Sequence, residues 1–557
     1  MKITSIPQLY RNANRWREIV GVLSKYGLAG WLSRFELPIG GSLLKSADGE
    51  VLASLNQETR VRRALEELGP TFIKLGQVLS TRPDVIGVEL ADELVKLQAA
   101  APEDDEAWVR RVCEEDFGCP LEECFSEFSL KPVASASIGQ VHRAWLRDGQ
   151  PIAIKVRHRN IEHRVSVDTD ILMGLAQLAE RIPELKNYRP SALAEEFQRT
   201  LLRELDFLRE RRRLEQFAGY FSESEEVHVP ATFPERCSER VLTIEWLDGL
   251  KVSDPALRQR PHEELQAIAQ RGAQAFITMV FEHGVYHADP HPGNLIVLDS
   301  GGIGLIDFGM VGRLSPSLRE DLEEMVIAIV NQDAQLLTSL VIRVGATPSD
   351  LDEAALSVDV ADYLDHYGNL SVGDFNVGGA LRELVSIIRR YQIVLPASLG
   401  MLIKLLIMLE GTAQLLSPEF SLIEVLAPMQ RRMMLRRLSP RRQARKLRRF
   451  WFEAEQLAGS LPRRMSDILQ QVQTGRFDVH LDHRGLEPSV NRLVLGMLTS
   501  ALILGSSLML SHAVMPIHFW PLRGVSAPGL VGFTLSGMLG LRLLRAISKS
   551  GWLERRK

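Results

Sequence analysis

Three polar residues in the middle of the chain have the spacing of a site for phosphate chemistry. Asp289 is followed five residues later by Asn294, and Asn294 is followed thirteen residues later by Asp307. Kinase-type sites place one aspartate beside the transferred phosphate and use an asparagine and a second aspartate to hold Mg²⁺. Oxygen ligands of this kind suit Mg²⁺, which completes its shell with water and phosphate. We therefore predict that Asp289 is catalytic and that Asn294 and Asp307 bind the metal; an ordinary polar turn is the alternative.

A lysine at the end of an apolar strand could complete this site. Lys155 ends the sequence Ile152-Ala153-Ile154-Lys155, and a lysine in this setting reaches the phosphates and pairs with a helix glutamate. The candidate partners, Glu204 and Glu210, are six residues apart and would point about 240° apart on a straight helix. We therefore predict two separate contacts, one of which could be made with Lys74, and exposed glutamates are the alternative.

The loop before this lysine differs from the Gly-rich loop of a kinase. Ala134, Ser135, Ala136 and Ser137 have small side chains that let the backbone approach phosphate, and the serines can donate hydrogen bonds. Their Cβ atoms limit the positive φ angles that glycine allows, so nucleotide handling should differ from that of a standard kinase.

The elements that must position these residues follow from local pattern. Two strands around Asp148-Gly149 predict a hairpin over 130–157, followed by helices from about 165 to 220. A strand over 241–249 carries Glu245 and Leu247, which are also assigned to nucleotide binding. From Ser315, a predicted N-cap followed by proline, to about 428 the pattern is helical. The fold class is α+β, a protein-kinase-like fold of two lobes with an N-terminal helical extension.

Two uncharged segments near the C-terminus predict a transmembrane helix hairpin. Leu493–Ser511 has nineteen residues and Gly524–Leu541 has eighteen, enough to cross a hydrocarbon core. Basic residues lie before the first segment and after the second, so both ends should face the cytoplasm. The alternative is a buried helical pair in a soluble domain. Pairs of small residues four apart, such as Ser536 and Gly540, would permit close packing or a homodimer.

The charge distribution and the cysteine content narrow the possible partners and metal sites further. The net charge of −4 names no partner, but residues 431–449 contain ten basic residues and no acidic one. This run predicts a segment on anionic lipid rather than a nucleic-acid site, with a solvated helix face as the alternative. The four cysteines form no C-x-x-C pair, so we expect reduced, structural thiols and no zinc site. The N-terminus has no secretory signal pattern, which indicates a cytoplasmic domain.

Taken in order, these motifs resemble those of the UbiB/AarF family of atypical kinase-like proteins, which support isoprenoid-quinone metabolism. The matching residues are Lys74-Leu75-Gly76-Gln77, Ala134–Ser137, Lys155, Glu204-Leu205-Asp206 with Glu210, His287-Ala288-Asp289-Pro290-His291-Pro292-Gly293-Asn294, and Asp307-Phe308-Gly309.

The resemblance implies a role for each of these residues. Lys155 would contact ATP and pair with Glu210, and Lys74 would pair with Glu204. Gln77 would lie close to the nucleotide in the catalytic site, with Mg²⁺ as cofactor. Quinone precursors and quinone-biosynthesis enzymes would be partners, at a bacterial-type inner or plasma membrane.

The predicted organisation leaves little room for a peptide substrate. We expect an extension over 1–60, a kinase-like domain over 61–430 with its lobes meeting near 249, a basic linker over 431–490 and two membrane helices over 491–547. Gly309 is followed almost at once by the helix predicted at Ser315. The resemblance therefore implies an ATPase supporting ubiquinone biosynthesis. A small-molecule or lipid phosphotransferase, or a nucleotide-dependent scaffold, is the alternative.

Overall fold

The computed structural model describes residues 12–28, 55–97, 102–180, 182, 187–368, 376–426, 451, 486–517 and 525–548. The chain divides into two compact units, residues 1–439 and 440–557, which are considered separately. The basic run predicted to meet lipid, residues 431–449, lies outside the described residues.

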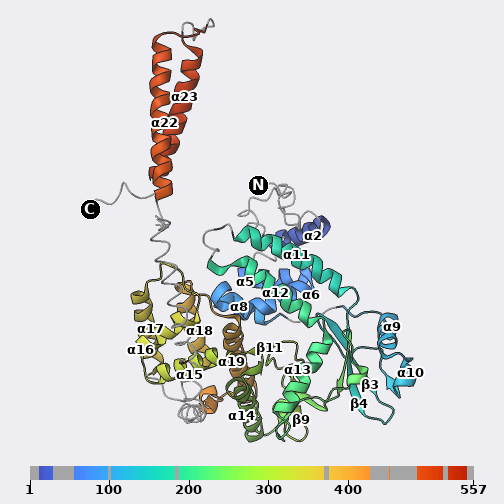
Figure 1. Cartoon of the computed structure of the whole chain (residues 1–557). Helices are drawn as coiled ribbons and strands as arrows, with labels where there is room; N and C mark the ends of the chain where they lie inside the picture. The colour runs from blue at the N-terminus through green and yellow to red at the C-terminus, as the bar shows by residue number, and fades with distance from the viewer. Residues whose placement is uncertain are drawn as a thin grey trace. The chain divides into compact units, whose positions relative to one another are not determined.

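An antiparallel sheet forms the N-terminal lobe of the first unit. Its strands have the order β1-β3-β4-β6, with β2 paired to β3. They are β1 (Glu127–Phe128), β2 (Ala134–Ser135), β3 (Gly139–Trp145), β4 (Pro151–Arg157) and β6 (Val241–Glu245). The hairpin predicted around Asp148-Gly149 is confirmed, since β3 and β4 pair on either side of it. Successive side chains of a strand point to opposite faces. Ile154 is therefore buried with residues of α9 (Glu106–Phe117), while its neighbour Lys155 faces the other way. Figure 1 shows α9 beside β3 and β4.

The strand predicted over 241–249 is wrong in extent. The chain leaves the first sheet after Glu245 and begins β7 (Gly249–Lys251), which pairs with a strand of the second lobe. Gly249 comes so close to Val297 that a Cβ would collide with its carbonyl oxygen, and its φ is 158°. The segment between the two strands therefore connects the lobes.

Helices cover the face of the sheet to which Lys155 points. They are α11 (Ile161–Ala179), α12 (Pro190–Glu204) and α13 (Phe207–Tyr220). α12 and α13 are separate helices because Asp206 leaves the helical conformation and its carboxylate accepts a hydrogen bond from the Leu208 amide at 3.1 Å. An N-cap of this kind begins a new helix.

The N-terminal helices pack on one another, and the first and third of them also contact α11. They are α2 (Ala13–Lys25), α5 (Gln57–Leu68), α6 (Pro70–Leu79), α7 (Pro83–Ile86) and α8 (Val88–Val95). Arg15 of α2 donates to the fully buried carboxylate of Asp168 in α11 at 2.7 Å. Gly69, with a φ of 93°, separates α5 from α6, which begins at Pro70.

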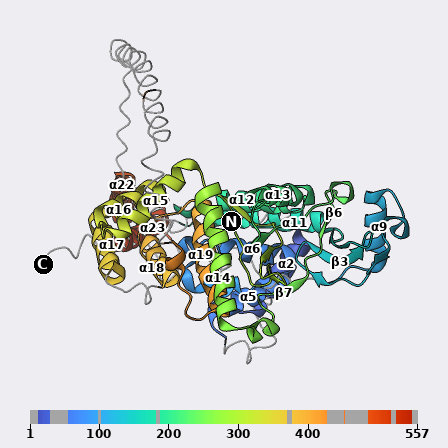
Figure 2. The ribbon, with the colours of Figure 1, turned by 90° about the horizontal axis from the view of Figure 1, so that it is seen from below.

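The second lobe is mainly helical and holds two small sheets. Its strands are β5 (Val227–His228), β7, β8 (Val285–His287), β9 (Leu295–Leu298), β10 (Ile303–Leu305) and β11 (Val311–Arg313), arranged as β5-β10-β9-β7 and β11-β8. Its helices are α14 (His262–Thr278), α15 (Pro316–Val330), α16 (Ala334–Val344), α17 (Glu353–Gly368), α18 (Val377–Arg390) and α19 (Ala397–Leu416), with the short turns η3 (Pro234–Arg236), η4 (Pro255–Gln259) and η5 (Met279–His283). α14 and α19 lie side by side (Figures 1 and 2).

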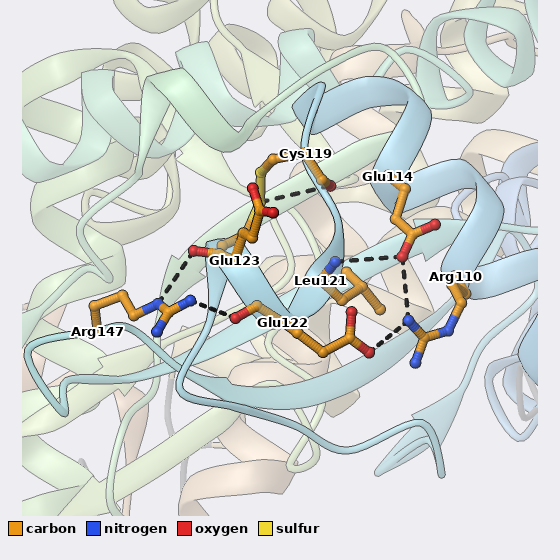
Figure 3. The surroundings of a disulfide bond; sticks show 8 residues. Arg110, Glu114, Cys119, Leu121, Glu122, Glu123 and Arg147 are labelled. Carbon is orange, nitrogen blue, oxygen red and sulfur yellow. Dashed lines mark hydrogen bonds and ion pairs between the residues drawn. A yellow bond between two sulfur atoms is a disulfide. The ribbon is translucent and has the colours of Figure 1, made fainter.

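Two of the cysteines depart from the prediction of reduced thiols. Cys119 and Cys124 form a disulfide at the corner between α9 and α10 (Leu121–Cys124) (Figure 3). Gly118 ends α9 in the left-handed conformation, so the chain turns back and leaves the two Cα atoms 6.4 Å apart, within reach of a disulfide. Cys113 and Cys237 are free thiols. Residue spacing alone could not reveal this turn.

The second unit contains two long apolar helices. α22 (Leu486–Ser511) and α23 (Ala527–Ser548) run side by side (Figure 1). α23 begins three residues after the predicted start of its segment and continues past Leu541. Both helices are long and apolar enough to cross a membrane, and so is α19. Most of α19 is buried inside the first unit, however, whereas α22 and α23 expose most of their described side chains.

Candidate nucleotide site

Lys155 of β4 faces two carboxylates. Its ammonium lies 2.9 Å and 3.0 Å from the oxygens of Glu210 and 3.4 Å from Oδ1 of Asp307. It also lies 5.3 Å from the centre of the Phe207 ring. Glu210 stands in the first turn of α13, so the contact joins that helix to the sheet. The pairing implied by the family resemblance is present.

The second predicted contact is also present. Lys74 of α6 lies 2.8 Å from Glu204, the last residue of α12. The cap at Asp206 separates α12 from α13, so the two glutamates belong to different helices and reach different lysines. The prediction of two separate contacts is therefore confirmed, with the glutamates on two helices rather than on one.

Asp289 and Asn294 close the loop between β8 and β9. The Asn294 amide nitrogen donates to Oδ2 of Asp289 at 3.0 Å and to its carbonyl oxygen at 3.2 Å. This arrangement turns the amide oxygen of Asn294 away from Asp289 and leaves it available to a cation. Asp307 has a φ of 59°, which is uncommon outside glycine, and the Gly309 amide donates to its Oδ1 at 3.2 Å.

His287 ties the two loops together. The Asp289 amide donates to its Nδ1 at 3.2 Å, and its Nε2 lies 3.0 Å from the carbonyl oxygen of Asp307. These partners assign the proton to Nε2. The ring is fully buried, with its centre 5.0 Å from that of Phe308. His287 therefore fixes the distance between the Asp289 and Asp307 backbones.

Arg213 was not recognised as a site residue from the sequence. It belongs to α13 and donates to the carbonyl oxygens of Phe308 and Gly309 at 3.1 Å and 2.7 Å. Burial lowers its pKa, against the attraction of Glu204 and Glu210. Three successive arginines, Arg211 to Arg213, stand in this helix, and only the three-dimensional fold shows which one reaches the loop.

The charges of the site stabilise one another. Lys155 lowers the pKa of Asp307 strongly; burial opposes this, and Lys74 and His287 add to it. Burial acts to lower the pKa of Lys155, but Asp307 and Glu210 outweigh it and raise the pKa. The pKa of Lys74 is likewise raised, because Glu204 and Asp307 outweigh its burial. At neutral pH the site therefore holds charged lysines against an ionised Asp307.

A cavity of about 230 Å³ lies between these side chains. It is lined by Lys74, Gln77, Ser80, Leu94, Val95, Leu97, Ala136, Ser137, Asp289, His291, Asn294, Asp307, Met310, Lys404 and Met408. The predicted residues of α6, the small-residue loop and both acidic loops thus meet in one place. The cavity is smaller than the roughly 300–1,000 Å³ of most ligand pockets.

The small-residue loop is held by a buried polar network. His158 lies 2.8 Å from the carbonyl oxygen of Ala136 and 2.6 Å from the carboxylate of Asp104. Gly139, the first residue of β3 after this loop, approaches β4 so closely that a Cβ would lie 2.5 Å from the Val156 carbonyl oxygen. Ala136 and Ser137 line the cavity, whereas Ala134 and Ser135 form β2 beside β3.

Several predicted nucleotide contacts are not among the residues that line this cavity. Lys155, Glu204 and Glu210 form the ion pairs described above, and Glu245 and Leu247 lie farther along the chain. Glu245 accepts hydrogen bonds from the His228 ring and the Ala231 amide, each at 3.0 Å, and so holds the preceding loop. Leu247 packs against Gly304 of β10. Both lie where the chain passes between the lobes, and neither lines the cavity.

The oxygen donors present fit Mg²⁺. Asp307 supplies a carboxylate and Asn294 an amide oxygen, and both face the same cavity. Two protein oxygens are the usual number when phosphates and water complete an octahedral shell. The described residues hold no cluster of three or more His, Cys, Asp or Glu side chains suited to a metal.

The segment between Gly309 and the next helix is short. It forms β11, and the Ser315 hydroxyl then accepts a hydrogen bond from the Leu318 amide at 3.1 Å, with Pro316 as the first residue of α15. The predicted helix start is confirmed. Only a few residues therefore separate the loop of Asp307 and Gly309 from α15.

An antiparallel sheet over a helical lobe, with the lysine–glutamate pair and two acidic loops between them, defines a protein-kinase-like fold. Family models agree. The ABC1 atypical kinase-like domain matches residues 96–341, the UbiB helical domain matches residues 360–421, and the ABC1/UbiB kinase-like C-terminal domain matches residues 480–549.

Similar proteins extend over most of the chain. A "probable protein kinase UbiB" of Xylella fastidiosa is 32% identical over 82% of this chain and 84% of its own length. An uncharacterized protein from the hydrogenase 1 5′ region of Clostridium pasteurianum is 28% identical over 97% of this chain and 99% of its own. The solved complex of Rv3197 with erythromycin, from Mycobacterium tuberculosis, is 24% identical with a TM-score of 0.45, covering 63% of this chain and 90% of that one. The chain belongs to the UbiB/AarF family of atypical kinase-like proteins.

Proposed function

We propose that this protein is a membrane-anchored, Mg²⁺-dependent ATPase that supports isoprenoid-quinone biosynthesis. Lys155 would hold the nucleotide phosphates, Asn294 and Asp307 would hold Mg²⁺, and Asp289 would orient the attacking water. Bound Mg²⁺ would neutralise the phosphate oxygens and so favour phosphate release. The quinone assignment rests on the family resemblance.

The observation that carries the ATPase proposal is the covering of the cavity. Leu94, Val95 and Leu97 at the end of α8 line it together with Lys74 and Gln77 of α6. These helices line the same cavity as Asp289, and the short segment before α15 offers little surface on which a peptide could lie. Water and small molecules fit this enclosure better than a protein substrate.

The second unit supports a membrane location. α22 and α23 expose many large apolar side chains, among them Leu493, Leu504, Met538 and Leu541. Such a surface suits lipid tails, and basic residues lie at the outer ends of the two helices. We infer that the hairpin anchors the protein in an inner or plasma membrane, with the kinase-like unit in the cytoplasm near quinone precursors and the enzymes that use them.

The proposal is tested by ATP turnover of the full chain in vesicles with and without anionic lipid. We expect phosphate release that depends on Mg²⁺ and falls at least about a hundredfold in Asp307→Asn and Lys155→Ala, because each removes a charge held against the phosphates. Asp299→Asn, an exposed aspartate in the turn after β9, is the matched control and should behave as the wild type. Binding of Mg-ATP without phosphate release under any lipid condition would contradict an ATPase and favour the scaffold role.

A second candidate is a phosphotransferase for a small apolar molecule. A second cavity, of about 410 Å³, lies beside the first and is lined mainly by apolar residues of α6, α12 and α19, such as Leu75, Phe197 and Met401. Gly309 and Met310 also line it, so it meets the loop of Asp307 and Gly309. Transfer of label from γ-labelled ATP to an extractable lipid or metabolite would favour this candidate over the ATPase.

A further inference from the structure

Lys404 is a buried lysine that the site described so far does not use. It lies in the middle of α19 between the buried residues Ile403 and Leu405, and it is 6% exposed. Its side chain lines the nucleotide cavity together with Asp289 and Lys74. Among the residues that the structure describes, it makes no hydrogen bond or ion pair.

The helix that carries Lys404 is fixed against the loop between β8 and β9. This loop carries Asp289 and is called the catalytic loop below. The Thr412 hydroxyl donates to the Pro290 carbonyl oxygen at 3.1 Å, and the Tyr286 hydroxyl donates to the Ser398 carbonyl oxygen at 2.6 Å. Thr412 follows Lys404 by eight residues, which is about 80° around the helix. Both side chains therefore lie on the side of α19 that faces the loop.

The acidic residues nearby do not neutralise Lys404. Glu410 on the same helix accepts hydrogen bonds from the Val377 and Gly378 amides, at 3.3 Å and 2.6 Å, and so caps α18. Burial lowers the pKa of Lys404; Asp289 opposes this shift, and Lys74 adds to it. Lys74 has Glu204 within 2.8 Å, whereas Lys404 has no such partner. A buried ammonium without a partner is costly, so an anion in the cavity would relieve that cost.

The catalytic loop itself supplies no lysine or arginine. Between Asp289 and Asn294 the sequence is Pro-His-Pro-Gly, and Nδ1 of His291 accepts a hydrogen bond from the Gly293 amide. Lys155 approaches from the Glu210 side of the site. A phosphate beside Asp289 would therefore meet two lysines that line the cavity, Lys74, which already has Glu204 as partner, and Lys404 of α19.

We propose that Lys404 binds the terminal phosphate of the nucleotide beside Asp289. This inference rests on the proposed nucleotide site and adds a subsite that distinguishes triphosphate from diphosphate. Mg²⁺ held by Asn294 and Asp307 would cover one side of the terminal phosphate, and the Lys404 ammonium the other. The anion it takes is a phosphate, either on a nucleotide or free.

The test compares two nucleotides on the full chain in detergent or nanodiscs. Dissociation constants of Mg-ADP and of Mg-AMP-PNP, a non-hydrolysable triphosphate, are measured for the wild type, Lys404→Met and Lys404→Arg. We expect Lys404→Met to weaken AMP-PNP binding by about ten- to a hundredfold, the range of one charge-assisted hydrogen bond, and to leave ADP within about twofold. Lys404→Arg should retain most of the preference. Lys251→Met, at an exposed lysine of β7, is the control.

A second measurement distinguishes binding of free phosphate from binding of the terminal phosphate of a nucleotide. Inorganic phosphate added with Mg-ADP should bind to the wild type and not to Lys404→Met if the subsite also holds the free ion. Equal weakening of both nucleotides, or no weakening of either, would overturn the proposal. If the wild type binds neither nucleotide, the proposed function fails as well. Lys404→Met removes a buried charge, so its melting temperature should equal or exceed that of the wild type, which excludes misfolding as the cause.

Discussion

At the scale of single residues, charged side chains of the candidate site hold its backbone and one another in place. Lys155 and Lys74 each have a glutamate partner, and Arg213 has two carbonyl oxygens. Asp307 stands in an uncommon conformation that neighbouring bonds must maintain. The loop that carries Asp307 is therefore positioned partly by α13.

Arg213→Met should loosen this loop. The change leaves the Phe308 and Gly309 carbonyl oxygens without their donor, so we expect the free energy of unfolding to fall by about 1.5–3 kcal/mol. Mg-nucleotide affinity should fall with it, since Asp307 would lose its fixed position. Calorimetric unfolding and nucleotide titration check both effects. Arg212→Met is the matched control, because that neighbouring side chain is 62% exposed and should change stability by less than about 0.5 kcal/mol. Equal effects of the two substitutions would refute the argument.

The sequence predicted the residues whose type and spacing define the chemistry. Asp289, Asn294 and Asp307 line one cavity, and both lysine–glutamate pairs are present. It did not predict Arg213 or Lys404 as site residues. An arginine within a run of arginines and a lysine within an apolar helix carry no local signal of what they face, and their contacts depend on how distant helices pack. Glu245 and Leu247 do not line this cavity, since the chain leaves the sheet earlier than its β-pattern indicates, and their contact with a nucleotide stays a prediction.

At the scale of elements, a close helix contact and a set of hydrogen bonds hold α6 and α8 over the cavity. Gly76 lets α6 approach α8 closely, since a Cβ there would collide with Leu97. Glu93 of α8 accepts hydrogen bonds from Thr59 and Arg62 of α5, at 3.0 Å and 2.8 Å, and from Lys96 at 2.5 Å. These contacts join the covering helices into one layer.

The Glu93 contacts predict a dependence on pH. Burial acts to raise the pKa of Glu93, but the hydrogen bonds from Lys96, Arg62 and Thr59 outweigh it and lower the pKa to about 2. A carboxylate with a lowered pKa stabilises the folded state above its unfolded pKa of 4.5 and loses that effect as pH falls toward 2. We therefore expect Glu93→Gln to cost about 1–3 kcal/mol at pH 7 and progressively less from about pH 4.5 downward.

This prediction is checked by measuring the unfolding free energies of the wild type and Glu93→Gln from pH 7 to pH 3. Glu89→Gln, an exposed glutamate of the same helix, should show little cost at any pH. A cost of Glu93→Gln that stays constant with pH would show that the carboxylate charge is not the cause. Hydrogen exchange in α5 and α8 would show whether the loss is confined to the covering layer.

At the scale of the whole molecule, three helices of similar apolar character have different surroundings. α19 is held inside the first unit by bonds to the catalytic loop and carries Lys404 and Glu410. α22 and α23 instead pack on each other through small residues. Ser506 and Ser536 are buried, and Gly529 lies 3.0–3.1 Å, measured from an added Cβ, from backbone atoms of Leu510 and Ser506. Length and hydropathy alone would not separate these cases, whereas the charged Lys404 and Glu410 within α19 are typical of a helix held inside a protein.

The close approach of α22 and α23 predicts the effect of a larger side chain at Gly532. A Cβ at this position would collide with Ser506, so Gly532→Ile should separate the helices, whereas Gly537 has nothing within 4 Å and Gly537→Ile should be tolerated. The separation is measured by oxidative crosslinking of Thr499→Cys with Gly540→Cys in the full chain in membranes, because an added Cβ at Gly540 would lie 3.8 Å from the Thr499 side chain. We expect Gly532→Ile to reduce the crosslinked fraction roughly fivefold or more, and Gly537→Ile to leave it unchanged. Equal crosslinking in both variants would mean that the hairpin is held by its connection rather than by the glycine contact.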